Sequence, residues 1–226
     1  MISATPILIS IEGNIGSGKS TLLKQLRARH PNWHFIDEPV EAWMSLRHSN
    51  GKSLLELFYE DKKRWAYTFQ NTAILTRIIS ARKAIDDWRA AGCPGSNIFI
   101  AERCVHTDMH VFAKLILADG DIDSIEWDIY MKWFNAFSKQ IPDPSGFIHV
   151  DTPVTICAER IGVRERAGEG HIPTEYLDRL DTAHFNWLRA DEFPTPVLRF
   201  DNVSKDQTSI EVVERWVDRQ WLESMD

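Results

Sequence analysis

The segment GNIGSGKS at residues 13–20 is the feature that most restricts what this chain can fold into. It fits the pattern G-x-x-x-x-G-K-[S/T], in which a glycine-rich turn, a lysine and a hydroxyl residue surround phosphate groups. The pattern carries this meaning only between a strand and a helix. An apolar run at residues 7–11 precedes it, and a helix-like stretch at residues 21–29 follows it. The sequence therefore predicts a phosphate-binding loop between a buried strand and a helix.

The residues of this loop have distinct expected roles. Inward-pointing N–H groups and the positive end of the following helix both attract anions. Lys19 would reach the β- and γ-phosphates, and Ser20 would bind Mg²⁺. A glycine-rich turn that only ends a strand is the structural alternative. The motif predicts nucleotide binding but not the reaction, because kinases, GTPases and motor ATPases share it. Phosphate contacts are expected from Gly13, Asn14, Gly16, Ser17, Gly18, Lys19, Ser20 and Thr21.

Strand-like and helix-like stretches alternate along the rest of the chain. Further β-prone runs lie at residues 33–36, 98–101, 147–150 and 197–200. Helical stretches lie at residues 53–89 with a break near 60–61, and at 105–117, 124–140, 154–166, 175–190 and 210–224. This alternation is typical of a parallel sheet covered on both faces. We predict one α/β domain over residues 1–226, a P-loop NTPase-type three-layer fold with a five-stranded parallel sheet, helices on both faces, and an arginine-rich lid at about residues 160–172.

Charged residues follow the predicted strands, where parallel sheets bind their ligands. Glu38 follows the second run, Glu102 and Arg103 the third, and Asp201 the fifth. Phosphoryl transfer needs a base near the acceptor hydroxyl and cations around the moving group. Glu38 is the candidate base, Arg103 the candidate ligand of the acceptor or transferred group, and Glu102 the candidate metal ligand beside Ser20. A solvated loop carboxylate and a surface Glu102–Arg103 pair are the alternatives.

Three arginines gather within seven residues of the candidate lid: Arg160, Arg164 and Arg166. The first two are four residues apart and share a helix face. Glycines follow them in a chain whose net charge is −7, so a local basic cluster needs a local reason. We interpret the cluster as a lid that supplies cations to phosphates. A solvated basic face paired with neighbouring glutamates is the alternative.

The predicted long helix carries polar residues on an otherwise apolar stripe. Gln70 and Arg77 are seven residues apart and nearly share a face, and Tyr59 would join them if the helix reached that far. Buried amides and guanidiniums need partners, and a nucleobase edge offers a donor and an acceptor together. Asp108 and Phe112 are four residues apart on the next helical stretch and could face the same pocket. A polar pair facing solvent or another helix is the alternative.

Composition restricts the partners and the compartment. The negative net charge argues against a nucleic-acid or membrane-surface partner. The three cysteines, Cys93, Cys104 and Cys157, are odd in number and lack metal-ligand spacing, which favours reduced thiols. No apolar run reaches the length of a membrane span. We expect a cytoplasmic protein with no membrane partner.

Longer segments extend the pattern along nearly the whole chain: IEGNIGSGKST, DEPVEAW, LFYEDKKRWAYTFQ, AERCVHTD, RERAGEGHIPTEYLDRL and VLRFD. In these segments and their order, the chain resembles the cellular deoxyribonucleoside kinases, especially the branch acting on deoxycytidine, deoxyguanosine and deoxyadenosine. The resemblance implies ATP-dependent phosphorylation of the 5′-hydroxyl of deoxyribonucleosides for nucleotide salvage. It also implies Mg²⁺ as cofactor, ATP as phosphate donor, and a homodimer. One departure is Cys104, which stands where the family usually has serine.

The resemblance implies roles at the reaction centre. Glu38 would take the proton from the sugar 5′-hydroxyl, and Arg103 would bind near that hydroxyl and the transferred group. Glu102 would help to organise Mg²⁺. The lid arginines and Asp201 would contact the ATP or its phosphates, and the stretch after Asp201 would lie near the adenine of the donor.

The resemblance also implies a nucleoside pocket. Tyr59 and Glu169 would hold the 3′-hydroxyl, and Gln70 would read the base edge. The Arg77/Asp108 pair matches one carried by deoxycytidine- and purine-type members. Ionised Asp108 accepts a hydrogen bond from an exocyclic amine and repels a carbonyl oxygen, so we expect thymidine to be a poor substrate. The pair should favour cytosine and adenine directly, with guanine accommodated through Arg77. The implied nucleoside contacts are Ile15, Trp43, Leu55, Tyr59, Phe69, Gln70, Arg77, Asp108, Phe112 and Glu169.

Two other function classes share parts of this pattern. A thymidylate-type nucleoside monophosphate kinase would need an additional arginine for the acceptor's phosphate, and Glu38 would be out of place as its base. A regulatory P-loop switch or binding module would be expected to carry an N-K-x-D segment that reads guanine, which the sequence lacks. A catalytically inactive kinase fold is disfavoured by the presence of Lys19, Glu38 and Arg103.

Overall fold

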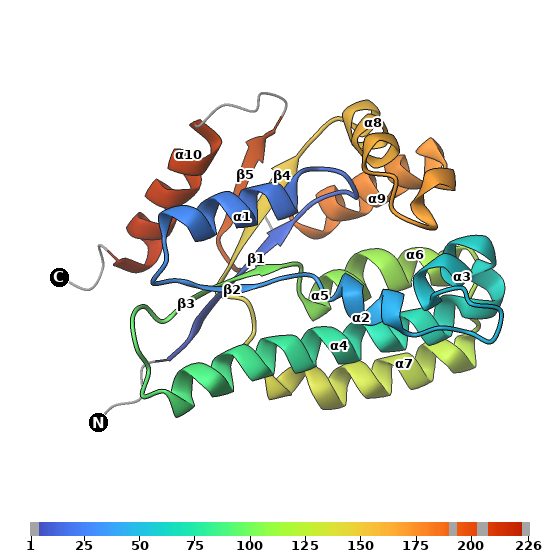
Figure 1. Cartoon of the computed structure of the whole chain (residues 1–226), viewed down its shortest axis with the longest axis horizontal. Coiled ribbons are helices and arrows are strands. Elements are labelled where there is room, and N and C mark those ends of the chain that lie inside the picture. The colour runs from blue at the N-terminus through green and yellow to red at the C-terminus, as the bar shows by residue number, and fades with distance from the viewer. Residues whose placement is uncertain (1–4, 190–193, 203–207, 223–226) are drawn as a thin grey trace.

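The predicted apolar runs pair into a five-stranded parallel sheet with the order β2-β3-β1-β4-β5. The computed structural model describes residues 5–189, 194–202 and 208–222 of the chain. The predicted fold class is confirmed, and each strand matches its predicted run within two residues (Figure 1). The strands are β1 (Ile7–Glu12), β2 (His34–Ile36), β3 (Ile98–Glu102), β4 (Gly146–Asp151) and β5 (Val197–Asp201).

Helices follow or connect these strands. The α-helices are α1 (Lys19–Arg29), α2 (Val40–Ser45), α3 (Leu54–Glu60), α4 (Lys62–Ala90), α5 (Val105–Thr107), α6 (Lys114–Ala118), α7 (Ser124–Phe137), α8 (Val154–Arg164), α9 (Thr174–Trp187) and α10 (Thr208–Val217). Tighter or wider turns are the π-helices Asp108–Ala113 and Asp218–Leu222 and the 3₁₀-helices Ser138–Gln140 and Glu169–His171.

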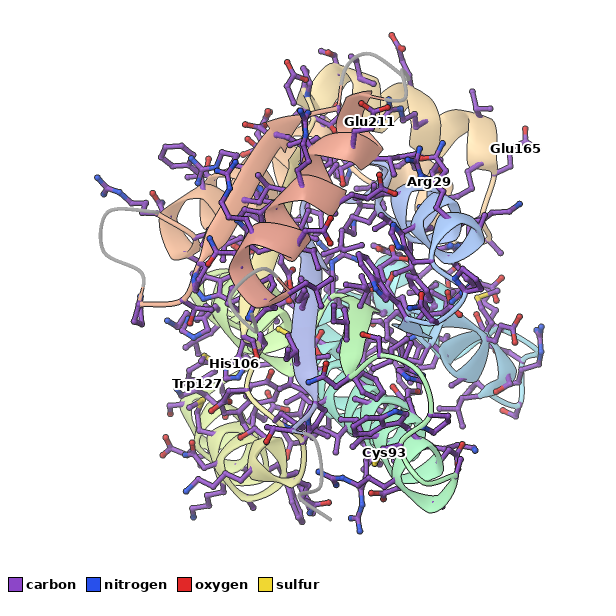
Figure 2. The ribbon with its side chains drawn as sticks, turned by 90° about the vertical axis from the view of Figure 1, so that its left-hand side faces the viewer. Arg29, Cys93, His106, Trp127, Glu165 and Glu211 are labelled. Carbon is purple, nitrogen blue, oxygen red and sulfur yellow. The ribbon has the colours of Figure 1, made fainter. Side chains whose placement is uncertain are left out.

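Two apolar layers enclose the sheet. On one face, α1 and α10 pack against the central strands, with Leu23, Ile100 and Val213 in one core cluster. On the other face, α4 and α7 pack with the π-helical segment around Phe99 and Tyr130 (Figure 1). Figure 2 views the molecule from the side of α10, whose neighbour α1 ends near the labelled Arg29. The sheet is therefore the middle of three layers, as the alternating pattern predicts.

The break predicted near residues 60–61 is confirmed, because α3 ends at Glu60 and α4 begins at Lys62. Asp61 caps α4 by accepting a hydrogen bond from the Arg64 N–H with its side chain. The backbone of Asp61 (φ −143°) is not helical, so the chain changes direction between α3 and α4.

Several predictions of helix type, helix bounds and helix number differ from the structure. The single helix predicted at residues 105–117 contains a π-helical turn, Asp108–Ala113, between α5 and α6. The lid helix ends at Arg164 rather than at residue 166, because Glu165 adopts a left-handed conformation (φ 49°). The short helix α2 was not predicted. The helix predicted to reach residue 190 ends at Trp187, where α9 ends, and the helix end predicted at residue 224 lies outside the described residues. Among the described helices, none combines the length and apolarity that crossing a bilayer requires.

Candidate active site

A cavity of about 660 Å³ opens at the carboxyl ends of the strands. Its walls come from the phosphate loop, α1, the segments after β2 and β3, the helices α3, α4 and α8, and the π-helical turn. This is the edge where parallel sheets bind ligands. The predicted site residues that line it are Ile15, Gly16, Gly18, Lys19, Ser20, Thr21, Glu38, Trp43, Leu55, Tyr59, Phe69, Gln70, Arg77, Glu102, Arg103, Asp108, Phe112, Arg160, Arg164, Arg166 and Glu169.

Four predicted residues lie off the cavity wall: Gly13, Asn14, Ser17 and Asp201. Asn14 is buried, and its side chain donates to the Leu177 carbonyl at 2.8 Å and accepts from the Ile15 N–H at 2.9 Å. Gly13 has a φ of 137°, and a Cβ there would lie 2.5 Å from the Val150 carbonyl oxygen. Asn14 and Gly13 therefore fix the conformation of the loop on the side away from the cavity.

The loop holds Lys19 as a nearly buried cation, with an exposed fraction of 3%. Its ammonium donates to the Asn14 carbonyl at 2.6 Å. Burial, with a contribution from Arg103, lowers the pKa of Lys19 to about 7. A desolvated ammonium held only by neutral oxygens is a good partner for a polyphosphate.

Three segments of the chain donate hydrogen bonds to the backbone carbonyl of Ser17. It accepts hydrogen bonds from Thr152 at 3.0 Å, from Arg160 at 3.1 Å and from the Asn202 amide at 2.8 Å. Arg160 also donates to the Asn202 carbonyl at 3.2 Å. Asn202 lines the cavity where Asp201 was predicted to, and the adjoining residues 203–207 lie outside the described residues.

Glu38 stands at the centre of the cavity and is held by two guanidiniums. Its Oε1 accepts from Arg103 at 2.8 Å and from Arg77 at 3.0 Å. Burial raises the pKa of the Glu38 carboxyl, but Arg103, Arg77 and Lys19 outweigh burial and hold that pKa well below its usual range. Glu38 is therefore a fixed, ionised carboxylate that can accept a hydrogen bond from a hydroxyl group and orient it.

Ser20 and Glu102 lie together as predicted for metal ligands. The Ser20 hydroxyl donates to Glu102 Oε1 at 2.9 Å. Both side chains face the cavity beside Lys19. A hydroxyl and a carboxylate next to a phosphate loop are the oxygen donors that Mg²⁺ takes together with nucleotide phosphates, so the residues fit that ion.

The far end of the cavity combines aromatic walls with polar groups. Gln70 is buried, and its Oε1 has no hydrogen-bond partner among the described residues. Arg77 Nε donates to Asp108 Oδ2 at 2.9 Å. The rings of Trp43 and Phe69 meet edge to face with centroids 5.2 Å apart. An unpaired amide oxygen beside a fixed ion pair and flat walls suits a nucleobase.

Several wall residues were not predicted: Leu22, Gln25, Phe58, Ala73, Tyr176 and Asn202. Phe58 stacks on Phe69 at 4.5 Å, which was hard to foresee because apolar residues on a short helix look like ordinary core. Tyr176 is buried, and no group in the described ranges forms a hydrogen bond with its hydroxyl. A tyrosine in the first turn of a helix just after the lid was the available signal.

An acidic residue joins two of the arginines in the predicted lid segment through ion pairs. Glu169 is buried and pairs with Arg164 and, at 3.0 Å, with Arg166. Glu165, at the end of α8, points away from the body of the molecule (Figure 2). The sequence predicted all three arginines and Glu169 at the site but did not predict that Arg164 and Arg166 pair with Glu169.

The phosphate loop, the buried lysine and the acidic residue at the next strand end define a P-loop kinase-like site. A family model, Deoxynucleoside kinase, matches residues 9–221. The chain is 36% identical over 197 residues to Deoxycytidine kinase 2 of Gallus gallus, covering 80% of this chain and 73% of that protein. It is 32% identical over 196 residues to human Deoxycytidine kinase, covering 80% and 74%.

Another relative is the mitochondrial Deoxyguanosine kinase of Xenopus laevis, which is 29% identical over 194 residues and covers 80% of this chain and 72% of that protein. This chain belongs to the deoxynucleoside kinase family, as its sequence motifs predict. It is a phosphotransferase of nucleoside salvage that phosphorylates deoxyribonucleosides with ATP. The family assignment favours this function over the monophosphate kinase and switch alternatives.

Proposed function

We propose that the chain phosphorylates the 5′-hydroxyl of deoxyadenosine, deoxycytidine and deoxyguanosine in preference to thymidine. The observation that carries the proposal is the arrangement around Arg77. Its guanidinium joins Asp108, at the base end of the cavity, to Glu38, at 2.9 and 3.0 Å respectively. The ion pairs of Arg77 with Asp108 and Glu38 would therefore position both the base and the 5′-hydroxyl of the acceptor nucleoside.

The residues supply the steps of an in-line transfer. Glu38 orients the 5′-hydroxyl and accepts its proton, while Arg103 stabilises the charge that develops on the transferred group. Lys19 binds the phosphates of ATP, and Arg164 and Arg166 would exchange Glu169 for phosphate oxygens. We propose Ser20 and Glu102 as the residues that hold Mg²⁺, which neutralises phosphate charge when bound.

Base preference would follow from the ion pair. Burial raises the pKa of Asp108, and Arg77 opposes that rise. Since Arg77 donates to Asp108, the carboxylate offers its remaining acceptor positions to an exocyclic amine. A thymine carbonyl would face this acceptor, and unmatched buried polar groups discriminate strongly between substrates.

A turnover assay with Mg·ATP tests this proposal directly. Deoxyadenosine, deoxyguanosine, deoxycytidine, thymidine and thymidylate are compared as acceptors by kcat/KM. We expect the three amino-bearing nucleosides to exceed thymidine by at least about tenfold. A preference for thymidine would contradict the role given to Arg77 and Asp108. Activity on thymidylate alone would contradict the acceptor site itself.

We also propose a homodimer formed through α4 and α7. These helices pack side by side, and both expose large apolar side chains: Ile79 is 55% exposed on α4, and Trp133 is 47% exposed on α7. Leu75 and Ile129 extend the two stripes by one turn each. Sedimentation should give a dimer that Ile79→Glu with Trp133→Glu converts to a monomer. Phe185→Glu, on α9, is the matched control and should remain dimeric.

A cytoplasmic location is proposed from the cysteines. Cys104 and Cys157 are buried free thiols, and Cys93 is a half-buried one. Reduced thiols are typical of cytosolic proteins. Fractionation of cells that express the protein tests this, and recovery with mitochondria would contradict it.

A further inference from the structure

A buried carboxylate beneath the phosphate loop has no role in the transfer described above. Glu12 ends β1 and directly precedes Gly13, the first glycine of the loop. It has no exposed surface and does not line the cavity. Because a buried carboxylate is costly unless it is paired or hydrogen-bonded, its contacts need a functional explanation.

One oxygen of Glu12 gathers three donors. Oε1 accepts from the Ser10 hydroxyl at 2.5 Å, from the Thr107 hydroxyl at 2.7 Å and from the Cys104 thiol at 3.6 Å. Burial raises the pKa of the Cys104 thiol to about 12, so the thiol keeps the proton that it donates. Cys104 lies in the turn after β3 and Thr107 ends the short helix α5 that follows it, so Glu12 links this segment to the strand that carries the phosphate loop.

The same turn carries Arg103 in an unusual backbone conformation. Arg103 has a φ of 62°, in the left-handed region that non-glycine residues rarely adopt. Its N–H donates to the Ile11 carbonyl at 3.0 Å, and the following Cys104 N–H donates to the Thr107 hydroxyl at 3.2 Å. Such a conformation persists only where neighbouring contacts hold it, and the Thr107 hydroxyl bound by Glu12 is one of those contacts.

The guanidinium of Arg103 then spans the reaction centre. Nη1 donates to Glu38 Oε1 at 2.8 Å, and Nη2 donates to the Gly13 carbonyl at 3.0 Å. Its Nε and the second oxygen of Glu12 are both buried, and neither has a hydrogen-bond partner within the part of the chain that the structure describes. Burial raises the pKa of the Glu12 carboxyl, and Arg103 opposes that rise.

We propose that Glu12 is a positioning residue for Arg103, holding the turn after β3 so that the guanidinium lies between the phosphate loop and Glu38. The inference rests on the proposed function, since it assigns Glu12 an effect on phosphoryl transfer through Arg103. A purely structural Glu12 would instead stabilise the sheet and leave the chemistry of the folded protein unchanged.

Kinetics of Glu12→Gln separates these roles, because glutamine keeps the volume and one acceptor oxygen but removes the charge. We expect kcat to fall by about 10- to 100-fold, as for a displaced catalytic group, with both KM values within about threefold of wild type. In an Arg103→Lys background, the same substitution should change kcat by less than about twofold. Independent, multiplying effects of the two substitutions would overturn the proposal, as would an unchanged kcat in Glu12→Gln.

Matched variants control for folding. Ile148→Val in β4 removes one buried methylene near Glu12 and should lower the melting temperature without changing kcat or KM. Thr107→Ser keeps the hydroxyl that binds Glu12 and should retain kcat within about twofold, whereas the isosteric Thr107→Val should lower kcat in the same direction as Glu12→Gln. Equal kcat values for Thr107→Ser and Thr107→Val would contradict a role for this hydroxyl bond.

A second readout does not depend on turnover. The Nε–H signal of Arg103 in ¹⁵N NMR spectra, assigned by its loss in Arg103→Lys, should shift and exchange faster with water in Glu12→Gln. The Arg77 signal, whose Nε is bonded to Asp108, is the internal control and should change little. An unchanged Arg103 signal would overturn the inference. A wild-type protein inactive on every nucleoside, but with the expected NMR change, would refute the proposed function and leave this positioning role standing.

Discussion

Replacing Glu38 by glutamine tests the centre of the site most directly. Glutamine keeps a carbonyl oxygen for the two donors, Arg103 at 2.8 Å and Arg77 at 3.0 Å, but it cannot take up a proton. A positioned general base contributes about 10²- to 10⁴-fold to a rate. We therefore expect kcat to fall by that factor, which corresponds to about 3–5 kcal/mol in the activation free energy.

The same substitution has a bounded effect on stability. Breaking a buried ion pair costs about 3–5 kcal/mol when it strands a charge. Arg77 keeps its pair with Asp108 at 2.9 Å, and Arg103 keeps its bond to the Gly13 carbonyl. The free energy of unfolding should therefore fall by less than that full cost, and the variant should remain folded at the assay temperature.

The assay is ADP release at saturating Mg·ATP and deoxycytidine, with KM measured for both. Glu41→Gln, an exposed carboxylate in the first turn of α2, is the matched control and should keep wild-type kinetics. If kcat of Glu38→Gln stays within about threefold of wild type, Glu38 is not the base. A raised nucleoside KM with unchanged kcat would make Glu38 a binding residue only.

Three further outcomes are expected from the site and the core. Gln70→Leu should raise the nucleoside KM about tenfold to 100-fold and leave the KM for ATP unchanged. The reason is that it removes a buried amide whose oxygen has no hydrogen-bond partner among the described residues. Equal effects on both KM values would contradict base recognition by Gln70. Since the pKa of Lys19 is lowered to about 7, ATP binding at pH 8 should take up close to one proton, measured by calorimetry in buffers of different ionisation enthalpy, and Lys19→Met should abolish that uptake. Burial and Arg199 lower the pKa of His149 to about 4, so the unfolded chain binds the extra proton below about pH 6.5. Stability should fall by about 3 kcal/mol as pH drops from 6.5 to 4 through this group. Urea unfolding of His149→Gln should show a smaller loss of stability, and an unchanged pH dependence would contradict the assignment.

The fold was predictable from the sequence because its determinants are local. Apolar runs of strand length and the glycine-lysine pattern at residues 13–20 place β1 and α1 without tertiary information. The break between α3 and α4 was also predictable, since Asp61 is a good helix cap. The short helix α2 was missed because six residues after Pro39 are too few to show a helical period.

Tertiary pairing explains what the sequence could not predict. The segment Asp108–Ala113 contains no helix-breaking residue, yet it widens to a π-helix where Asp108 meets Arg77 from another helix. Glu169 is expected at the sugar hydroxyl, which stays a prediction, and its pairing with Arg164 and Arg166 in the structure was not predicted. A sequence shows which charges are near each other, and not which of several partners each one takes.

The strand order also determines how early during synthesis the sheet can form. β1 lies at the centre of the sheet and pairs only with β3 and β4. The residue Ile7 must therefore wait for its partner Ile98, which is made 98 − 7 = 91 residues later. At roughly 5–20 residues per second, the delay is on the order of 5–20 s. The phosphate loop that begins at the end of this strand cannot acquire its final shape on the ribosome until β4, behind Gly13, has also been made.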